Sequence, residues 1–253
     1  MNVQTRKKAV LATGMSLVLF VLASLPLYAI TAEEIIRRME ENQVHDTAYS
    51  EGRMIINDRF GEKITTFRSW SEGEEKNLIE FTSREERGQK ILRTDDEIYL
   101  FFPDAAEIIR LQGAALRDSV LGSDLSYEDM TGDKGLLDTY DVKLLGTESV
   151  DGNECYKVEL TAISRDVPYP KEIAWVDTKL FVGRKVHKFS LSGKLLKEMV
   201  MEKFTTQKGK MFPVEFIMQD KMKRNSSTRF VIDEIEIGAD IPRNTFSLEE
   251  LTW

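Results

Sequence analysis

From Tyr49 onwards, apolar and polar residues alternate with a period of two, and turn residues interrupt the pattern at short intervals. Such alternation is typical of β-strands with one buried face, and Asp151-Gly152 is the strongest hairpin signal in the chain. The pattern predicts strands at residues 49–57, 63–71, 75–83, 88–94, 97–102, 106–112, 140–149, 153–162, 172–177, 180–190, 194–206, 210–221 and 228–237. The chain is therefore expected to be mainly β, with antiparallel strands, in one domain.

The alternation also predicts which side chains share a face. On the strand at 153–162, Val158 and Leu160 point one way, while Cys155 and Lys157 point to the other, wetter side. The inward face is expected to serve partly as core and partly as the lining of a ligand cavity. The residues predicted for it are Ile98, Leu100, Phe102, Val158, Leu160, Phe212, Val214, Phe216 and Met218.

A one-sided sheet of this size has to close into a barrel, fold into a sandwich, or curl and be covered. One covering helix is predicted at residues 32–43, which begins with a capping box formed by Thr31 and Glu34. A second, short helix is predicted near residues 124–131. Two small helices leave space in a curled sheet that an apolar ligand would fill. A sandwich filled by its own side chains fits the same pattern, so both interpretations stay open.

Residues 121–131 interrupt the strands, and we call them the cover segment. Ser123 and Asp124 are expected to cap its helix, because their side-chain oxygens can accept from backbone N–H groups one turn ahead. Asp124, Glu128, Asp129 and Asp133 are expected to form a solvated acidic rim, with adventitious cation binding as the alternative. The segment is either a crossover loop with one helical turn or a movable cover over the mouth of the sheet. The cover residues are Gly122, Ser123, Asp124, Leu125, Tyr127 and Met130.

Residues 1–29 have the three-part layout of a secretory signal peptide. Three basic residues, Arg6, Lys7 and Lys8, precede an apolar run, and Ala29 is a small residue in front of Ile30. An uncleaved membrane anchor is the alternative, although the run of about 17 residues is short for a bilayer span. Since no cysteine stands at the cleavage site, the exported protein is not expected to be lipidated and is assigned to the periplasm.

We predict that the protein recovered from its native envelope fraction begins at Ile30, because cleavage after Ala29 fits the layout of the segment. N-terminal sequencing checks this expectation. An intact Met1 in a membrane pellet would instead identify an anchor.

Composition and motifs exclude several classes of function. A formal net charge of −8 makes the chain a poor partner for nucleic acid and for anionic lipid surfaces. A single cysteine, Cys155, cannot form an intramolecular disulfide. The two histidines, His45 and His187, lack metal-ligand spacing, and neither a Gly-x-Ser-x-Gly elbow nor a phosphate-binding loop occurs. No catalytic residue, metal site or cofactor is predicted.

Two regions carry a resemblance to a known family. Residues 122–130 read GSDLSYEDM, and a strand pair before them includes FTS at 81–83, GQKIL at 88–92 and IYLFFP at 98–103. This sequence resembles the LolA-like outer-membrane lipoprotein-sorting proteins. The resemblance implies a curled, incompletely closed antiparallel β-barrel of about 11–13 strands, covered by a few short helices. It implies that residues 30–253 form a single lipid-binding domain whose concave face holds acyl chains.

The resemblance also implies a function without catalysis. The first hypothesis is a periplasmic carrier or chaperone that binds acyl chains of lipoproteins or other lipids for transfer towards the outer membrane. Its partners would include an inner-membrane exporter and an outer-membrane acceptor. The second hypothesis is a sensor of lipid or envelope stress that acts on a membrane regulator or exporter. An enzyme is the third, which the missing motifs disfavour.

Overall fold

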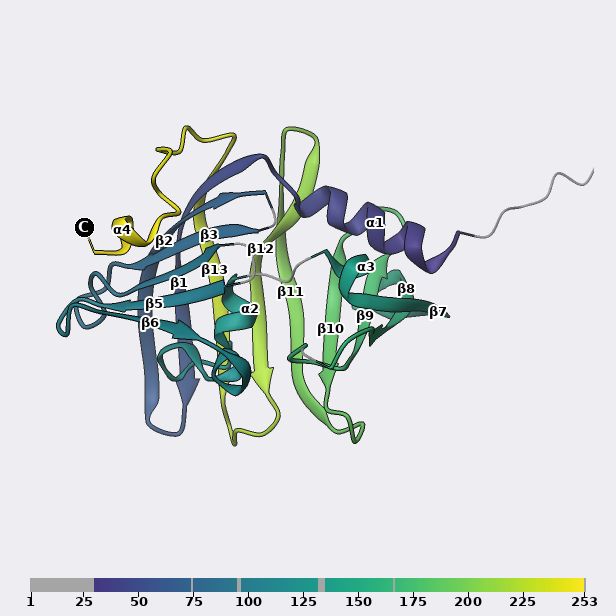
Figure 1. The fold of residues 1–253 in the computed structure, drawn as a ribbon. Coiled ribbons are helices and arrows are strands. Elements are labelled where there is room, and N and C mark those ends of the chain that lie inside the picture. The colour runs from purple at the N-terminus through teal and green to yellow at the C-terminus, as the bar shows by residue number, and fades with distance from the viewer. Residues whose placement is uncertain (1–29, 74, 95–96, 132–134, 166, 253) are drawn as a thin grey trace, which may run out of the picture.

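In the computed structural model, which describes residues 30–73, 75–94, 97–131, 135–165 and 167–252, thirteen antiparallel strands form one open sheet (Figure 1). The predicted signal peptide at residues 1–29 lies outside the described residues. In chain order the elements are α1 (Ala32–Gln43), β1 (Thr47–Asp58), β2 (Gly61–Glu72), β3 (Lys76–Phe81), β4 (Lys90–Thr94), β5 (Glu97–Phe102), β6 (Glu107–Leu111), η1 (Gly113–Arg117), η2 (Val120–Gly122), α2 (Tyr127–Thr131), α3 (Leu136–Thr139), β7 (Tyr140–Val150), β8 (Asn153–Ala162), β9 (Lys171–Asp177), β10 (Gly183–Phe189), β11 (Leu195–Gln207), β12 (Lys210–Asp220), β13 (Ser227–Ile237) and α4 (Leu248–Leu251).

The sheet joins two meanders. Its strand order is β6-β5-β4-β3-β2-β1-β13-β12-β11-β10-β9-β8-β7, so neighbours follow each other in sequence except where β1 pairs with β13. Each of the thirteen predicted strands overlaps an observed one, and the predicted mainly β, incompletely closed architecture with few short helices is confirmed. None of the helices in the described part of the chain combines the length and hydropathy needed to cross a bilayer.

A β-bulge in the central strand helps the sheet to curl. The register of β1 against β13 shifts between Glu51 and Gly52, and bulges of this kind bend a strand and increase its twist. A Cβ at Gly52 would lie 2.3 Å from the carbonyl oxygen of Val231 and 2.8 Å from the ring of Phe67. Only glycine fits this close crossing of β1 and β13.

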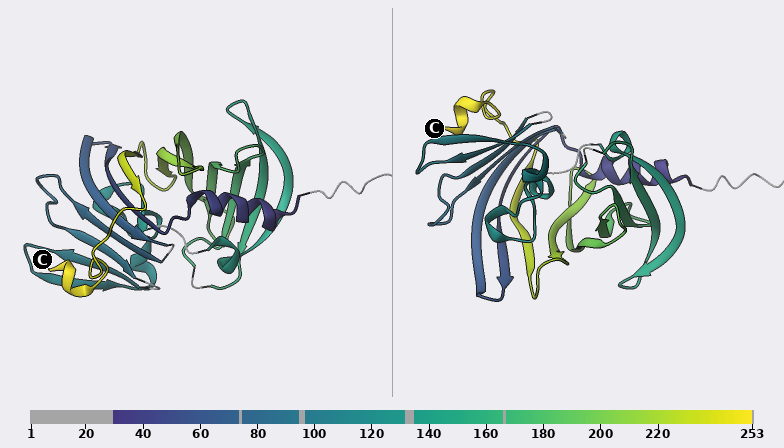
Figure 2. Two further views of the ribbon diagram at one scale, coloured as in Figure 1. Left: turned by 90° about the horizontal axis from the view of Figure 1, so that it is seen from above. Right: turned by 60° about the horizontal axis from the view of Figure 1, so that its bottom comes forward.

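Helix α1 covers one half of the sheet. Its N-cap is Thr31, whose side chain accepts from the N–H of Glu34 at 3.2 Å, as predicted. Ala32, Ile35, Ile36 and Met39 form its buried face and pack with side chains of β8, β9 and β10. Figure 2 shows α1 lying across this half of the curved sheet, where its apolar face is buried against the strands.

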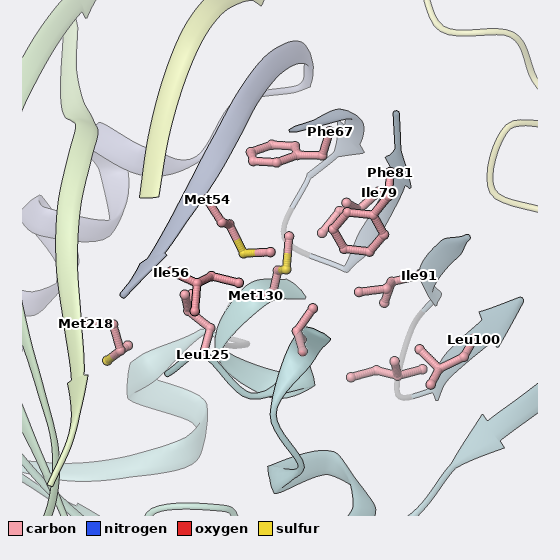
Figure 3. Packing of buried hydrophobic residues seen from close by; sticks show 12 residues of the cluster. Met54, Ile56, Phe67, Ile79, Phe81, Ile91, Leu100, Leu125, Met130 and Met218 are labelled. Atoms are coloured by element: carbon pink, nitrogen blue, oxygen red, sulfur yellow. The ribbon is translucent and has the colours of Figure 1, made fainter. Parts of the chain in front are cut away.

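The other half of the sheet encloses the segment that contains η1, η2 and α2. Leu125 and Met130 from this segment pack into a core built from both meanders (Figure 3). The buried members of this core are Met54, Ile56, Phe67, Ile79, Phe81, Ile91, Ile98, Leu100, Val120, Leu125, Met130 and Met218. The crossover between the two meanders is therefore an internal part of the fold.

The outer face of the sheet is less polar than the alternation predicts. Leu251 of α4 packs on Leu78, Leu92 and Phe101 and buries them, so the C-terminal segment is a cover that the sequence reading missed. Figure 2 shows this segment outside the half that contains β2 to β6. The prediction that Cys155 faces a wet side is wrong, because Cys155 is fully buried with Trp175. Large apolar residues on neighbouring strands create this second buried layer.

Candidate functional site

The residues predicted for a cavity lie in three clusters. Ile98, Leu100 and Met218 are buried in the core around the cover segment, and Phe102 and Phe216 pack against it. Val158 and Leu160 lie beneath α1. Phe212 and Val214 pack with Ala48 and Ile237 near the C-terminal end of α1. Of these predicted residues, Phe212 lines an open pocket of the hollow.

This pocket has a volume of about 260 Å³ and lies between the end of α1 and strands β1, β2, β3, β12 and β13. Its lining consists of Gln43, His45, Ala48, Ser50, Phe67, Ser69, Ser71, Asn77, Ile79, Met130, Phe212, Pro213, Phe230, Ile232 and Ile235. We call it the upper pocket. Met130 of the cover segment is among these lining residues.

Three aromatic rings stack beside the upper pocket, and two of them, Phe67 and Phe230, line it. The ring of Phe230 stacks on Phe67 and on Phe216, with centroids 4.9 Å apart in both pairs. The three rings come from β2, β13 and β12. In the sheet, β13 pairs with β12, and β1 lies between β13 and β2. They give the hollow a broad apolar surface of the kind that small-molecule pockets use.

Six of the fifteen lining residues of the upper pocket are polar: Gln43, His45, Ser50, Ser69, Ser71 and Asn77. The hydroxyls of Ser50 and Ser69 are hydrogen-bonded to each other at 2.8 Å. The side-chain oxygen of Asn77 is buried and has no hydrogen-bond partner among the described residues. A buried acceptor in this condition costs free energy until a donor reaches it. A ligand that brings a hydroxyl or an amide N–H to Asn77 would remove that cost.

His45 closes the rim of the pocket. Its ring meets Phe212 edge-on, with centroids 5.0 Å apart. Burial, and after it the positive charge of Lys210, lowers the pKa of His45 below its usual range. A neutral imidazole at near-neutral pH keeps this rim compatible with an apolar ligand.

The cover segment is capped differently from the prediction. Helix α2 begins after Ser126, whose hydroxyl accepts from the N–H of Asp129 at 3.2 Å, and the Asp129 carboxylate accepts from the N–H of Ser126 at 2.9 Å. Asp124 does not cap the helix. Its carboxylate accepts hydrogen bonds from the N–H of Asp220 and from the hydroxyls of Ser226 and Thr228, at 2.8–2.9 Å. Asp124 therefore pins the segment to β12 and β13.

Asp129 lies at the centre of a buried ionic cluster. Its carboxylate is 2.5 Å from the ammonium of Lys197 and 3.1 Å from that of Lys188, and it accepts from the hydroxyl of Tyr169 at 3.1 Å. Lys188 is also 3.5 Å from Glu172. The side chain of Asp129 is 1% exposed and Asp124 is equally buried, so the predicted solvated acidic rim is wrong for these two residues. Asp133 lies outside the described residues. Lys188 and Lys197 are cross-strand partners on the paired strands β10 and β11. Together they supply the charge that lets Asp129 be buried.

Electrostatics in this cluster favour the ionised carboxylate. Burial by itself would raise the pKa of Asp129, but the ammonium groups of Lys188 and Lys197 outweigh burial and hold this pKa well below its usual range. Burial, followed by the charge of Asp129, raises the pKa of Tyr169 far above its usual range. Tyr169 thus stays protonated and donates to the carboxylate.

A second ionic contact holds the opposite side of α2. Arg93 of β4 is buried, lies 3.9 Å from Glu128 and donates to the hydroxyl of Thr131 at 3.3 Å. Helix α2 is therefore attached to both meanders, through Arg93 on one side and Lys188 and Lys197 on the other. Sequence reasoning missed these three cations. The signal that could have found them is a charged residue on the inward face of a strand, as Arg93 stands beside Ile91.

The described residues contain no cluster of three or more His, Cys, Asp or Glu side chains that could hold a metal ion. Burial, and after it the charge of Asp177, raises the pKa of the Cys155 thiol, which disfavours the thiolate. The upper pocket therefore combines aromatic and aliphatic side chains with several polar groups.

Comparisons with known proteins agree with this geometry. A family model described as an uncharacterized protein matches residues 73–253. No curated protein sequence matches the chain significantly. Among solved structures, a LolA superfamily protein from Nitrosomonas europaea is similar with 27% identity and a TM-score of 0.74, over 88% of this chain and 100% of that one.

Two further solved structures share the fold. A DUF1329 family protein from Desulfovibrio piger has a TM-score of 0.81 at 22% identity, over 87% of this chain and 97% of that one. A putative outer membrane lipoprotein-sorting protein domain from Vibrio parahaemolyticus has a TM-score of 0.79 at 18% identity, over 88% of this chain and 100% of that one. All three cover nearly the whole of the described chain.

Proposed function

Since the chain belongs to the LolA superfamily and has the fold of outer-membrane lipoprotein-sorting proteins, we propose that it is an exported carrier for acyl chains. The observation that supports this most directly is the upper pocket, whose walls include Phe67, Phe212 and Phe230. Each methylene group of an acyl chain that leaves water for such a surface gains about 0.8 kcal/mol. The carrier would take lipoproteins or other lipids from an inner-membrane exporter, hold them in the periplasm without catalysis, and pass them to an outer-membrane acceptor.

The size of the pocket bears on how much of a lipid it holds. Its 260 Å³ is slightly below the roughly 300–1,000 Å³ of pockets that enclose drug-sized ligands. The cover segment occupies the adjoining part of the hollow with Leu125 and Met130. We propose that this segment withdraws from the hollow when a longer chain enters. Such an open state has to be a populated minor state for exchange to occur.

Native mass spectrometry of the gently purified protein, followed by extraction of the bound material, tests the carrier function. We expect an acylated molecule bound in one copy per chain, and its transfer to acceptor vesicles when these are added. A protein that carries no acylated molecule and takes up none from donor vesicles would overturn the proposal. A protein that binds lipid without releasing it would point to the sensor.

We predict that Ser71→Trp weakens binding of a fluorescent fatty acid by at least roughly tenfold, because an indole at this position fills the mouth of the upper pocket. Fluorescence titration measures the change. Ser149→Trp on the exposed edge strand β7 is the matched control and should leave both affinity and melting temperature unchanged. Equal affinities of the two variants would place the ligand elsewhere.

A further inference from the structure

At one end of the strands, large apolar side chains are exposed in the part of the chain that the structure describes. Adjacent strands are antiparallel, so the turns β1–β2, β12–β13, β10–β11 and β8–β9 follow one another along the same end of the sheet. Figure 1 shows the first three at the bottom of the view. We call this end the tip edge.

Each of these turns exposes a large apolar residue. Phe60 is 81% exposed on the β1–β2 turn, and Leu191 is 89% exposed on the β10–β11 turn. Met222 on the β12–β13 turn and Ile163 after β8 are exposed as well. The turns at the opposite end expose one large apolar side chain among the described residues. It is Leu180, on the β9–β10 turn. The apolar tips are thus concentrated at one end.

The same turns are basic, although the chain as a whole is acidic. In the sequence of these turns, Asp166 is the single acidic residue. Asp58 and Asp220 directly precede two of the turns, and their carboxylates accept from the N–H groups of Phe60 and Met222. The basic residues of the tip edge are Arg59, Arg165, Lys194, Lys221, Lys223 and Arg224. Lys221 is paired with Glu198, and Lys223 donates to Ser119 and to backbone oxygens of the cover segment.

Local charge, not net charge, decides what this edge meets. Salt screens charges beyond about 8 Å at physiological ionic strength, so carboxylates farther from the turns than this contribute little there. The guanidinium of Arg59 lies 4.5 Å from the centre of the Phe60 ring, which places a cation directly beside an exposed aromatic tip. Apolar residues flanked by cations are the combination that binds in the interface of an anionic bilayer.

A groove between two of the turns adds room for a polar group. It has a volume of about 670 Å³, is lined by Ile163 and Leu191, and also contains Arg117 and Arg165. Guanidinium groups bind phosphate oxygens in pairs of hydrogen bonds. The phosphate of a phospholipid headgroup could therefore bind Arg117 and Arg165 when the exposed apolar side chains of the turns enter the membrane interface.

We propose that the tip edge docks the protein on a lipid bilayer with anionic headgroups, with Phe60 and Leu191 inserted at the interface and the flanking cations at the phosphates. This docking does not depend on acyl chains binding in the hollow. It gives the protein a membrane-facing end, opposite the end at which the upper pocket lies.

Site-resolved fluorescence tests the proposal. Because Cys155 is buried, Phe60→Cys, Leu191→Cys and Leu180→Cys can each be labelled with an environment-sensitive dye on the exported, processed protein. Vesicles of phosphatidylethanolamine and phosphatidylglycerol should shift the emission to the blue at positions 60 and 191 and leave position 180 unchanged. The shift should decrease in phosphatidylcholine vesicles and at high salt. No shift at any position would overturn the proposal and favour a protein partner, and an equal shift at position 180 would overturn it as non-specific adsorption.

A paired variant gives an independent result. Phe60→Ser combined with Leu191→Ser should lower partitioning into the same anionic vesicles at least roughly tenfold, with an unchanged melting temperature because both side chains are exposed. Unchanged partitioning would overturn the proposal even if the wild-type protein binds vesicles.

Discussion

Asp129→Asn is expected to destabilise the protein by about 3–5 kcal/mol, the cost of removing one partner from a buried ion pair. The substitution keeps the size of the side chain but takes away the carboxylate that lies 2.5 Å from the buried ammonium of Lys197. It also weakens the attachment of α2 to β10 and β11. Equilibrium unfolding in urea at neutral pH measures the free energy of unfolding.

The matched control is Asp233→Asn, which removes an ion pair with Arg53 from the surface and should cost less than about 1 kcal/mol. The difference between wild type and Asp129→Asn should also depend on pH. Since the pKa of Asp129 is lowered in the folded protein, its stabilisation is complete above the unfolded value near 3.9 and is lost as the pH falls further. Equal effects of the two substitutions would mean that the cluster contributes no more than a surface pair.

Tyr127→Ala combined with Met130→Ala is expected to speed the loss of a bound fluorescent fatty acid by roughly tenfold or more, as a weaker closed state raises the open population. Met130 is buried in the core beside the upper pocket, and Tyr127 packs against the same core. Because Met130 is buried, its replacement is also expected to lower the free energy of unfolding by about 2 kcal/mol or more. The sequence alone suggested a loosely held cover, whose substitution would change stability little. Stopped-flow release into acceptor vesicles measures the rate.

Leu92→Ala is the control for this loss of stability. Leu92 is fully buried on the outer face beneath Leu251, so its replacement should lower the melting temperature comparably and leave release unchanged. If the double variant melts earlier but releases ligand at the wild-type rate, the cover segment is core structure and does not gate the hollow.

Local rules were sufficient to predict the strands. The alternation around Val158 and Leu160, the Asp151-Gly152 turn and the Thr31 capping box each depend on residues a few positions apart. These rules also placed an irregular, helical segment at residues 121–131. They worked because register in a one-sided sheet is fixed by which side chains must be buried.

The candidate site depends on contacts between distant residues, and these were not predictable. Ser123 and Asp124 have the right chemistry for a cap, yet Asp124 bonds to Thr228 and the cap passes to Ser126. Asp129 looks like a surface acid until Lys188 and Lys197, 59 and 68 positions away, are brought against it. Leu251 likewise covers Leu78, Leu92 and Phe101, residues that lie far from it in the sequence. A single sequence does not encode these pairings in any local pattern.

The central pairing of β1 with β13 also fixes the order in which the protein can fold. Strands β2 to β6 can add to β1 as the chain is synthesised, whereas residues 47–58 must wait for residues 227–237, near the end of the chain. Contacts between such distant segments slow folding. Until β13 arrives, one edge of β1 stays open, and open edges of this kind promote aggregation. The pairing of β1 with β13, at the middle of the finished sheet, is thus the last to form. Before it forms, the first meander of the nascent chain is the state most in need of protection by a chaperone.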